Sequence, residues 1–220
     1  TSYLQPMWAE QDPEDWFKSF LTTKTEAVRQ AGITGDDIDV IGVDGQMNGP
    51  VFMNSQGHLL RQAIVWLDQR SIVQVKRIDE RIGSDKILSI TGNPLTTTFT
   101  LPQLLWVKEN QPEIWDSLHK IQVPKDYIRF RLTGTWVMDI TDASGTLLFD
   151  INKMEWSEEI CNALDLPVDK LPNLVSSLDI VGYVTEEASR ITGLAKGIPV
   201  VAGGSDASAE ALATGTVDAG

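Results

Sequence analysis

Short runs of β-branched and apolar residues alternate with amphipathic helical segments along the whole chain of 220 residues. Residues 38–43, 63–67 and 198–202 are three such runs, and each has the length of a buried strand. Strands interleaved with helices predict a mixed α/β architecture, in which helices pack against a sheet. No internal repeat recurs at the period of a solenoid or propeller, so the alternation is not that of a repeat protein.

Residues that start and stop helices mark the helical segments. Asp12 offers a capping carboxylate ahead of Pro13, and apolar residues then recur at helical spacing up to Gly32, a typical C-terminal stop. Ser157 and Thr185 are expected to cap two shorter helices. The other predicted helices cover residues 72–82, 101–110, a segment opened by Pro112, 125–132 and 207–213.

Turn-forming residues predict how the remaining segments connect. The expected elements are a hairpin over residues 49–60 with its turn at 54–57, strands at 136–140 and 146–149 around a turn at 141–145, and a turn at 203–206. A further element is expected to begin in residues 217–220. Because the chain also has no initiating Met, we expect it to be a piece of a longer polypeptide.

The charge balance narrows the possible partners. Thirty-one acidic residues against eighteen basic ones leave a net charge of −13, which disfavours nucleic acid and anionic membrane surfaces. No apolar run has the length of a membrane span, and no signal segment opens the chain. The single cysteine, Cys161, excludes an intrachain disulfide and fits a reducing compartment, so we expect a cytoplasmic protein.

Two polar segments that follow predicted strands are candidates for a binding site. Gly45-Gln46-Met47-Asn48-Gly49 sets amides between glycines, where they can hydrogen-bond a hydroxylated ligand, although a simple strand-to-hairpin loop would use the same residues. Asp68 and Arg70 in Trp66-Leu67-Asp68-Gln69-Arg70 can form an ion pair, cap the next helix or line a cleft.

A third candidate is Gly203-Gly204-Ser205-Asp206, which places Asp206 in the first turn of a helix. The helix dipole stabilises a carboxylate there, and an ionised Asp can take a proton from a substrate hydroxyl during phosphoryl transfer. The alternative is that Ser205 or Asp206 only caps the helix. The sequence lacks the phosphate-binding loop, the dinucleotide fingerprint and His-Glu-x-x-His, and its histidines and Cys161 have no zinc-ligand spacing.

Seven motifs occur in an order that resembles one protein family. They are Gly45-Gln46-Met47-Asn48-Gly49, Trp66-x-Asp68-Gln69-Arg70, Thr91-Gly92-Asn93-Pro94, Pro124-Lys125-Asp126-Tyr127, Leu132-Thr133-Gly134, Asp142-Ala143-Ser144-Gly145-Thr146 and Val200-Val201-Ala202-Gly203-Gly204-Ser205-Asp206. This series resembles the FGGY carbohydrate kinases, and within them the xylulokinase branch. The resemblance covers essentially the whole chain.

The resemblance implies a fold, a reaction and a set of site residues. The fold would be the ribonuclease H-like domain of the actin and hexokinase type, and residues 1–220 would form most of the sugar-binding N-terminal domain, without its first strands and without the C-terminal ATP-binding domain. The reaction would be transfer of the ATP γ-phosphoryl group to a ketopentose such as xylulose, with Mg²⁺. Asp206 matches the catalytic base and would touch the metal only indirectly.

Other site residues follow from the same resemblance. Met47, Asn48 and Ala207 match positions that contact the sugar, Gln46 precedes them, and we expect Asp68 and Arg70 to brace the cleft wall from behind. Family members are often homodimers. A chain without the ATP lobe is expected to be inactive alone.

Three residues depart from the family pattern, and two of them, Asn48 and Ala207, match sugar-contacting positions and so leave the substrate open. Asn48 stands where xylulokinases usually have His, Ala207 where they have Asn, and Gln103 where they have Lys. The alternatives are therefore a kinase for another ketose, polyol or sugar acid, or a catalytically silent sugar-binding module.

Overall fold

The computed structural model describes residues 1–216, so the element expected in residues 217–220 lies outside the described residues. The helices are α1 (Pro13–Ala31), α2 (Ile72–Arg81), α3 (Ser84–Thr91), α4 (Thr100–Asn110), α5 (Pro112–Ser117), α6 (Pro124–Thr133), α7 (Ile140–Ser144), α8 (Glu158–Ala163), α9 (Glu186–Thr192) and α10 (Asp206–Ala213). The strands are β1 (Glu10–Gln11), β2 (Asp44–Gly45), β3 (Val51–Met53), β4 (Ala63–Ile64), β5 (Lys120–Gln122), β6 (Val137–Asp139), β7 (Phe149–Asp150), β8 (Glu155–Trp156), β9 (Asn173–Val175), β10 (Ile180–Tyr183), β11 (Pro199–Val201) and β12 (Gly204–Ser205). Two 3-10 turns lie at Gly35–Asp37 and Val168–Lys170. The predicted mixed α/β architecture is confirmed.

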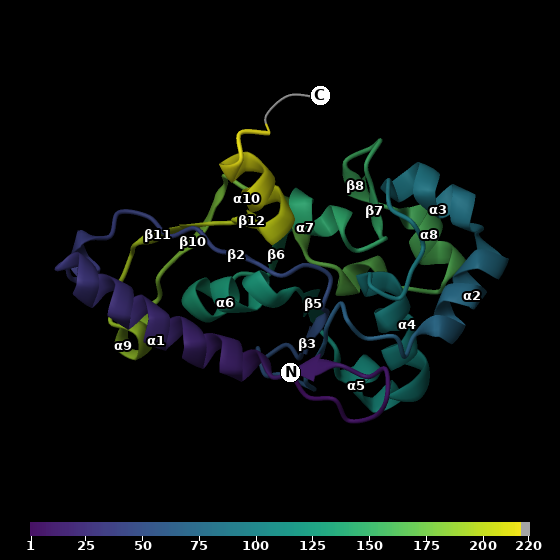
Figure 1. Ribbon diagram of the computed structural model, residues 1–220, viewed down its shortest axis with the longest axis horizontal. Coiled ribbons are helices and arrows are strands. Elements are labelled where there is room, and N and C mark those ends of the chain that lie inside the picture. Colours follow the sequence, from purple (N-terminus) through teal and green to yellow (C-terminus); the bar gives the residue numbers. More distant parts are fainter. Residues whose placement is uncertain (217–220) are drawn as a thin grey trace.

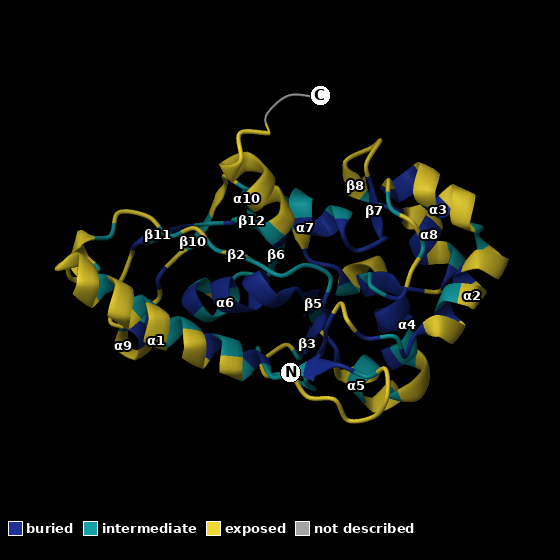
Figure 2. Cartoon of the chain, in the orientation of Figure 1, coloured by how far each residue is buried: buried dark blue, intermediate teal, exposed yellow. Residues whose placement is uncertain are grey.

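Helix α6 lies near the middle of the molecule, and the other elements pack around it in two groups (Figure 1). On one side it contacts α1, α9 and the strands β10 and β11. On the other side of the molecule α2, α3, α4 and α8 gather around a separate hydrophobic core (Figure 1). Figure 2 shows that α6 and α4 are mostly buried, whereas α10 presents exposed residues.

The strands pair two by two, and two of the pairs are parallel. β2 pairs with β12 and β6 pairs with β9 in parallel register, while β1–β4, β3–β5, β7–β8 and β10–β11 are antiparallel. A parallel pair brings the carboxyl ends of both strands to the same edge. Both parallel pairs join segments far apart in the sequence, so they decide which distant residues meet.

The predicted helix boundaries of α1 and α6 are confirmed. Asp12 accepts a hydrogen bond from the Glu14 backbone N–H at 2.9 Å, and Gly32 ends α1 in the left-handed region with φ 67°. Gly134 ends α6 in the same way, with φ 74°. Ser157 and Thr185 cap α8 and α9, as predicted. The expected hairpin also forms, because Leu60 N–H donates to the Phe52 carbonyl across the turn.

The prediction of a buried strand over residues 38–43 is wrong. Within it only Ile41 forms a bridge, to Val200, and Val40 is 53% exposed. Regular pairing begins at Asp44, in β2. β-branched side chains favour a strand where a neighbouring strand and a packed face receive them. Here Ile38, Ile41 and Val43 pack, partly buried, against hydrophobic clusters, but within this range of the described residues Ile41 alone bridges to another strand. The strand expected at 63–67 likewise shortens to β4, since Trp66 and Leu67 are exposed.

The turn predicted at residues 141–145 is a short helix, α7. Asp139 ends β6 and caps the helix, because its carboxylate accepts from the Thr141 N–H at 2.9 Å and from the Asp142 N–H at 3.4 Å. The sequence prediction missed Asp139 as a helix start. The strand expected at 146–149 is displaced to Phe149–Asp150, because α7 is followed by a turn before the strand begins. Within residues 1–216, no helix is both long enough and apolar enough to cross a bilayer.

Candidate active site

The parallel pair of β2 and β12 brings two of the candidate segments together. Gly204 lies opposite Asp44 and Ser205 opposite Gly45. The residues that follow at the shared edge are Gln46 on one segment and Asp206 on the other. Helix α10 also contacts β2 directly. The turn predicted at residues 203–206 is therefore wrong in its extent, because Gly204 and Ser205 form β12 and Asp206 begins α10. The glycine-flanked amide segment and Gly203-Gly204-Ser205-Asp206 meet at one place.

Asp206 is the first residue of α10, as the sequence predicts, and it does not cap the helix. The cap is Ser205, whose side chain accepts from the Ser208 N–H. Asp206 is partly exposed, and its Oδ1 accepts from the Ala207 N–H at 2.8 Å. Ser205 performs the capping, and Asp206 lies partly exposed at the edge of the β2–β12 pair with Oδ1 bound to the backbone. Ala207 is exposed beside it and offers a methyl group.

Asn48 is held in an unusual conformation with its side-chain oxygen buried. Its φ is 72°, in the left-handed region, and its carbonyl accepts from the Thr100 hydroxyl at 2.7 Å. The side-chain oxygen Oδ1 is buried without a hydrogen-bond partner. A buried acceptor without a donor costs free energy, so the conformation of this side chain is maintained by its surroundings at some cost.

Gly145 makes room for this side chain and for Met47. A Cβ on Gly145 would lie 2.6 Å from Asn48 Oδ1 and 2.6 Å from the Met47 methyl group. Gly145 is buried and directly follows α7. The sequence motif Asp142-Ala143-Ser144-Gly145-Thr146 therefore packs against Met47 and Asn48, a contact that spacing along the chain does not reveal.

Gln46 is directed toward β1 instead of toward Asn48. Its Nε2 donates to Gln11 Oε1 at 2.7 Å, and the Trp16 indole N–H donates to the same oxygen at 2.8 Å. Two cavities, of about 330 and 390 Å³, both include Gln46 and Trp16 in their walls. The structure thus places Gln46 at the same edge as Asp206, with its amide nitrogen engaged by Gln11.

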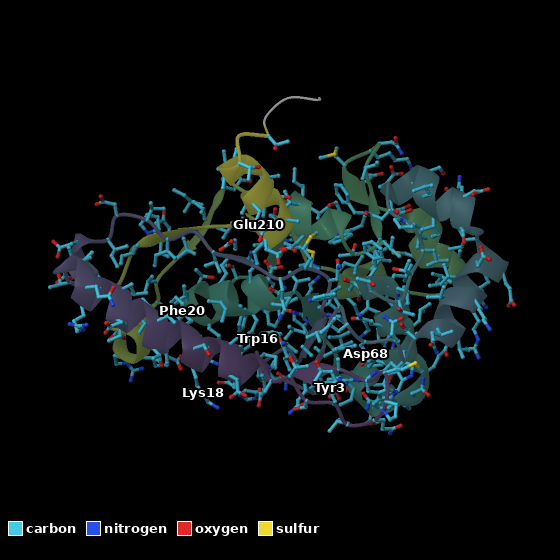
Figure 3. All side chains as sticks on the ribbon, viewed as in Figure 1. Tyr3, Trp16, Lys18, Phe20, Asp68 and Glu210 are labelled. Atoms are coloured by element: carbon cyan, nitrogen blue, oxygen red, sulfur yellow. The ribbon has the colours of Figure 1, made fainter. Side chains whose placement is uncertain are left out.

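Asp68 and Arg70 form a buried ion pair that lies away from α10. Arg70 Nη2 is 2.7 Å from Asp68 Oδ2, and the Ala9 N–H donates to the same oxygen at 2.6 Å. The Arg70 guanidinium stacks 3.8 Å from the centre of the Trp8 ring. Figure 3 shows Asp68 well separated from Glu210 on α10. The pair braces the start of the chain, and it reaches the site only through β1, where Glu10 binds Arg70 and Gln11 binds Gln46.

A cluster of five buried charges lies directly beneath the site, and the sequence prediction missed it. Lys125 Nζ is 2.7 Å from Asp126, 2.9 Å from Asp139 and 3.0 Å from Asp142, and Arg129 is 2.6 Å from Asp126. All five side chains are excluded from solvent. A Cβ on Gly45 would lie 3.3 Å from Lys125 Cβ, so the cluster abuts β2. The signal in the sequence was four charged residues, Lys125, Asp126, Arg129 and Arg131, within the predicted helix 125–132.

Burial and opposite charges set the protonation of this cluster. Burial disfavours the charged form of Lys125, but the three carboxylates outweigh it and raise the pKa of the ammonium. Burial raises the pKa of Asp142 to about 7. Burial also opposes ionisation of Asp139, yet Lys125 and the Thr141 and Ser177 hydroxyls hold the pKa of this carboxyl below its usual value. With Asp142 protonated, two cations face two carboxylates and the cluster is neutral.

The described residues contain no group of three histidine, cysteine or acidic side chains that could hold a metal ion. Mg²⁺ commonly uses one or two carboxylates together with substrate phosphates and water. Asp206, partly exposed and with one oxygen unbound by the backbone, fits the indirect contact that the family resemblance implies.

Comparison with known proteins identifies the class. The chain belongs to the FGGY family of carbohydrate kinases: residues 1–213 match the N-terminal domain of that family. Its relatives include the xylulose kinase of Bacillus subtilis (strain 168), 40% identical over 213 residues, and that of Escherichia coli (strain K12), 38% identical over 219 residues. Both alignments cover 97% of this chain, but it spans only 42% and 43% of the length of those relatives.

Solved structures agree with the fold. The xylulose kinase from Rhodospirillum rubrum matches 99% of this chain and 44% of its own, with a TM-score of 0.93 at 28% identity. Plasmodium falciparum glycerol kinase, solved with ADP, matches 99% of this chain and 44% of its own, with a TM-score of 0.87 at 26% identity. The expected actin-like ATPase fold is therefore confirmed.

Proposed function

We propose that this chain is the sugar-binding part of an ATP-dependent kinase that phosphorylates a hydroxyl of a ketopentose such as D-xylulose. One observation carries the proposal: the parallel β2–β12 pair places Asp206 at the same edge as the Gln46-Met47-Asn48 segment. The similarity to xylulose kinases over 97% of the chain supports the same activity class.

In this proposal each residue has a distinct chemical task. The Asn48 side-chain amide hydrogen-bonds to a sugar hydroxyl, Met47 packs against the carbon skeleton, and Asp206 accepts the proton of the attacking hydroxyl. The hydroxyl oxygen forms a bond to the terminal phosphorus of ATP as the bond to the ADP oxygen breaks. Mg²⁺, when bound, neutralises charge on the phosphates. ATP would meet the sugar at the exposed side of α10. The expected compartment of the protein is the cytoplasm.

The departures at Asn48 and Ala207 favour a second candidate within the same reaction. Asn48 and Ala207 offer a sugar fewer hydrogen-bonding groups than the His and Asn that xylulokinases usually have at these positions. A pocket built to hydrogen-bond a substrate hydroxyl discriminates strongly against a substrate that lacks this hydroxyl. A kinase for another ketose, a polyol or a sugar acid is therefore the second candidate, and a silent sugar-binding module is the third.

A homodimer stays a prediction, which light scattering on the purified protein tests.

The test is ADP release by the complete gene product that contains this chain, measured in a coupled assay across ketopentoses, polyols and sugar acids. We expect turnover on one sugar, reduced about 10²–10⁴-fold by Asp206→Asn while calorimetric sugar binding persists. Asn48→Gly is the complementary variant, because glycine accepts the φ of 72° while losing the amide. It should weaken sugar binding about tenfold.

The outcomes separate the three candidates. Turnover on xylulose supports the first, and turnover on a different sugar supports the second. Sugar binding without turnover on any sugar supports the silent module and refutes the kinase. Equal activity in wild type and Asp206→Asn would refute the role of Asp206.

A further inference from the structure

The segment that delivers Asp206 to the site is held at one end by Arg129 of the buried charge cluster and at the other by Thr141, which donates to Asp139 of the same cluster. Arg129 donates to the Ala202 carbonyl at 3.3 Å, at the beginning of the segment. At its end, the Ser205 backbone N–H donates to the Thr141 hydroxyl oxygen at 2.9 Å. Residues 202–205 lie between these anchors, and Asp206 follows immediately.

Asp139 is the group on which these contacts converge. Its Oδ2 accepts from the Thr141 hydroxyl at 2.6 Å and from the Ser177 hydroxyl at 2.7 Å. The Thr141 hydroxyl has one proton and donates it in the hydrogen bond to Asp139. Its oxygen is therefore oriented to accept from the Ser205 N–H. Ser177 in turn accepts the Gly203 N–H with its backbone carbonyl at 3.0 Å. One carboxylate thus orients the Thr141 acceptor and also binds the side chain of Ser177, the residue that supplies the second acceptor.

Lys125 keeps that carboxylate in its hydrogen-bond-accepting form. Its ammonium lies 2.9 Å from Asp139 Oδ1, the oxygen on the side opposite Thr141 and Ser177. Lys125 and Asp139 are both fully buried, so neither can exchange its partner for water. A charge-assisted hydrogen bond in such surroundings is shorter and stiffer than one between neutral groups.

We propose that Asp139 and Thr141 are positioning residues for Asp206: Asp139 orients the Thr141 hydroxyl, and Thr141 fixes the backbone at Ser205 so that Asp206 faces the sugar hydroxyl. The role of Asp206 as base rests on the proposed function, whereas the fixing of the segment does not. Reaction rates depend steeply on such placement, since about 1 Å of displacement can cost about 10²-fold.

Two measurements test this on variants Thr141→Val and Thr141→Ser. Valine keeps the shape of threonine and removes the hydroxyl, while serine retains it. In the complete gene product, Thr141→Val should lower kcat about 10- to 100-fold and change the sugar KM less than about threefold. Thr141→Ser should restore most of kcat. Asp139→Asn should act like Thr141→Val, and Ser157→Ala, which removes the cap of α8, is the matched control for lost stability alone.

Hydrogen–deuterium exchange on the 220-residue chain gives a readout that needs no kinase activity. Thr141→Val and Asp139→Asn should speed exchange in residues 203–208, and Thr141→Ser and Ser157→Ala should not. If the wild type has no turnover but exchange changes in this pattern, the proposed function fails and the anchoring stands. Unchanged exchange and unchanged kcat in Thr141→Val would overturn the proposal, as would an equal loss of kcat in Ser157→Ala.

Discussion

At the scale of single residues, the candidate site depends on side chains that only one backbone geometry can place. Asn48 has φ 72°, a conformation that asparagine tolerates better than most residues, and its Oδ1 is buried against Gly145. The sequence pointed to this segment because it sets amides between glycines, and the role of the segment stays a prediction. It did not indicate the direction of Gln46, because its partner Gln11 belongs to a different strand.

The space at Gly145 leads to a prediction at this scale. Gly145→Ala should push Met47 and Asn48 out of place and raise the sugar KM about tenfold, since the added methyl would lie 2.6 Å from each. Sugar titration calorimetry and the coupled assay measure this. Gly42→Ala is the control, because its Cβ would meet only Val201 at an ordinary 3.5 Å. Equal sugar affinity in both variants would contradict the contact.

At the scale of elements, the turn between β11 and β12 is the most constrained backbone near the site. Gly203 has φ 75°, and a Cβ there would lie 1.9 Å from the Val43 carbonyl oxygen. The clash is with backbone, which has little freedom to move. The turn therefore requires glycine both for its conformation and for the close approach of the segment before β2.

Two glycine variants separate these requirements. Gly197 has φ 88° with nothing within 4 Å of its Cβ position, so Gly197→Ala tests the conformation alone and should cost about 1–2 kcal/mol. Gly203→Ala adds the clash with the Val43 carbonyl, and it should lower the free energy of unfolding by clearly more than Gly197→Ala does. Urea unfolding of the 220-residue chain measures both free energies. Equal costs would show that the approach to Val43 can relax freely.

Element prediction succeeded where the signal was local and failed where it was not. Asp12, Gly32 and Gly134 start or stop helices through contacts within a few residues, and their roles are confirmed. In the described structure, residues 38–43 have one bridge to a neighbouring strand instead of the regular pairing that their composition indicates, and α7 forms because Asp139 caps it. The family resemblance identified the fold correctly because it used the order of seven motifs instead of the strength of any one.

At the scale of the whole molecule, the charge cluster joins α6, β6 and α7 beneath the site. It places three carboxylates against two cations in the protein interior. Sequence patterns do not predict that these five charged side chains are buried together, because charged residues are usually exposed to solvent. The arrangement predicts a pH dependence that surface charges would not produce.

Burial raises the pKa of Asp142 to about 7, so the folded chain keeps this proton where the unfolded chain has lost it. The contribution to stability is complete below the ordinary pKa of Asp, about 4, and is lost as pH rises toward 7. Asparagine carries no titrating proton, so the Asp142→Asn variant does not show this loss of stability with rising pH. The Tm of the variant minus the Tm of wild type should therefore increase by several degrees from pH 5 to pH 8, as measured by thermal unfolding.

Asp79→Asn is the control for this pH dependence. Ser84 hydrogen bonds lower the pKa of the Asp79 carboxyl, so it stays ionised across that range and its variant should show a constant Tm offset. A Tm difference for Asp142→Asn that is also constant from pH 5 to pH 8 would contradict a proton held on Asp142.

The parallel pairing of β2 with β12 also sets an order for folding. The two strands lie near the beginning and near the end of the described chain, so their contact closes one of the longest loops in the molecule. Closing a long loop costs little extra stability but slows the step that forms it. On the ribosome, the segment containing Asn48 emerges long before α10. A nascent chain can therefore fold its α2–α4 core first, and it brings Asp206 beside the Asn48 segment only after α10 has emerged.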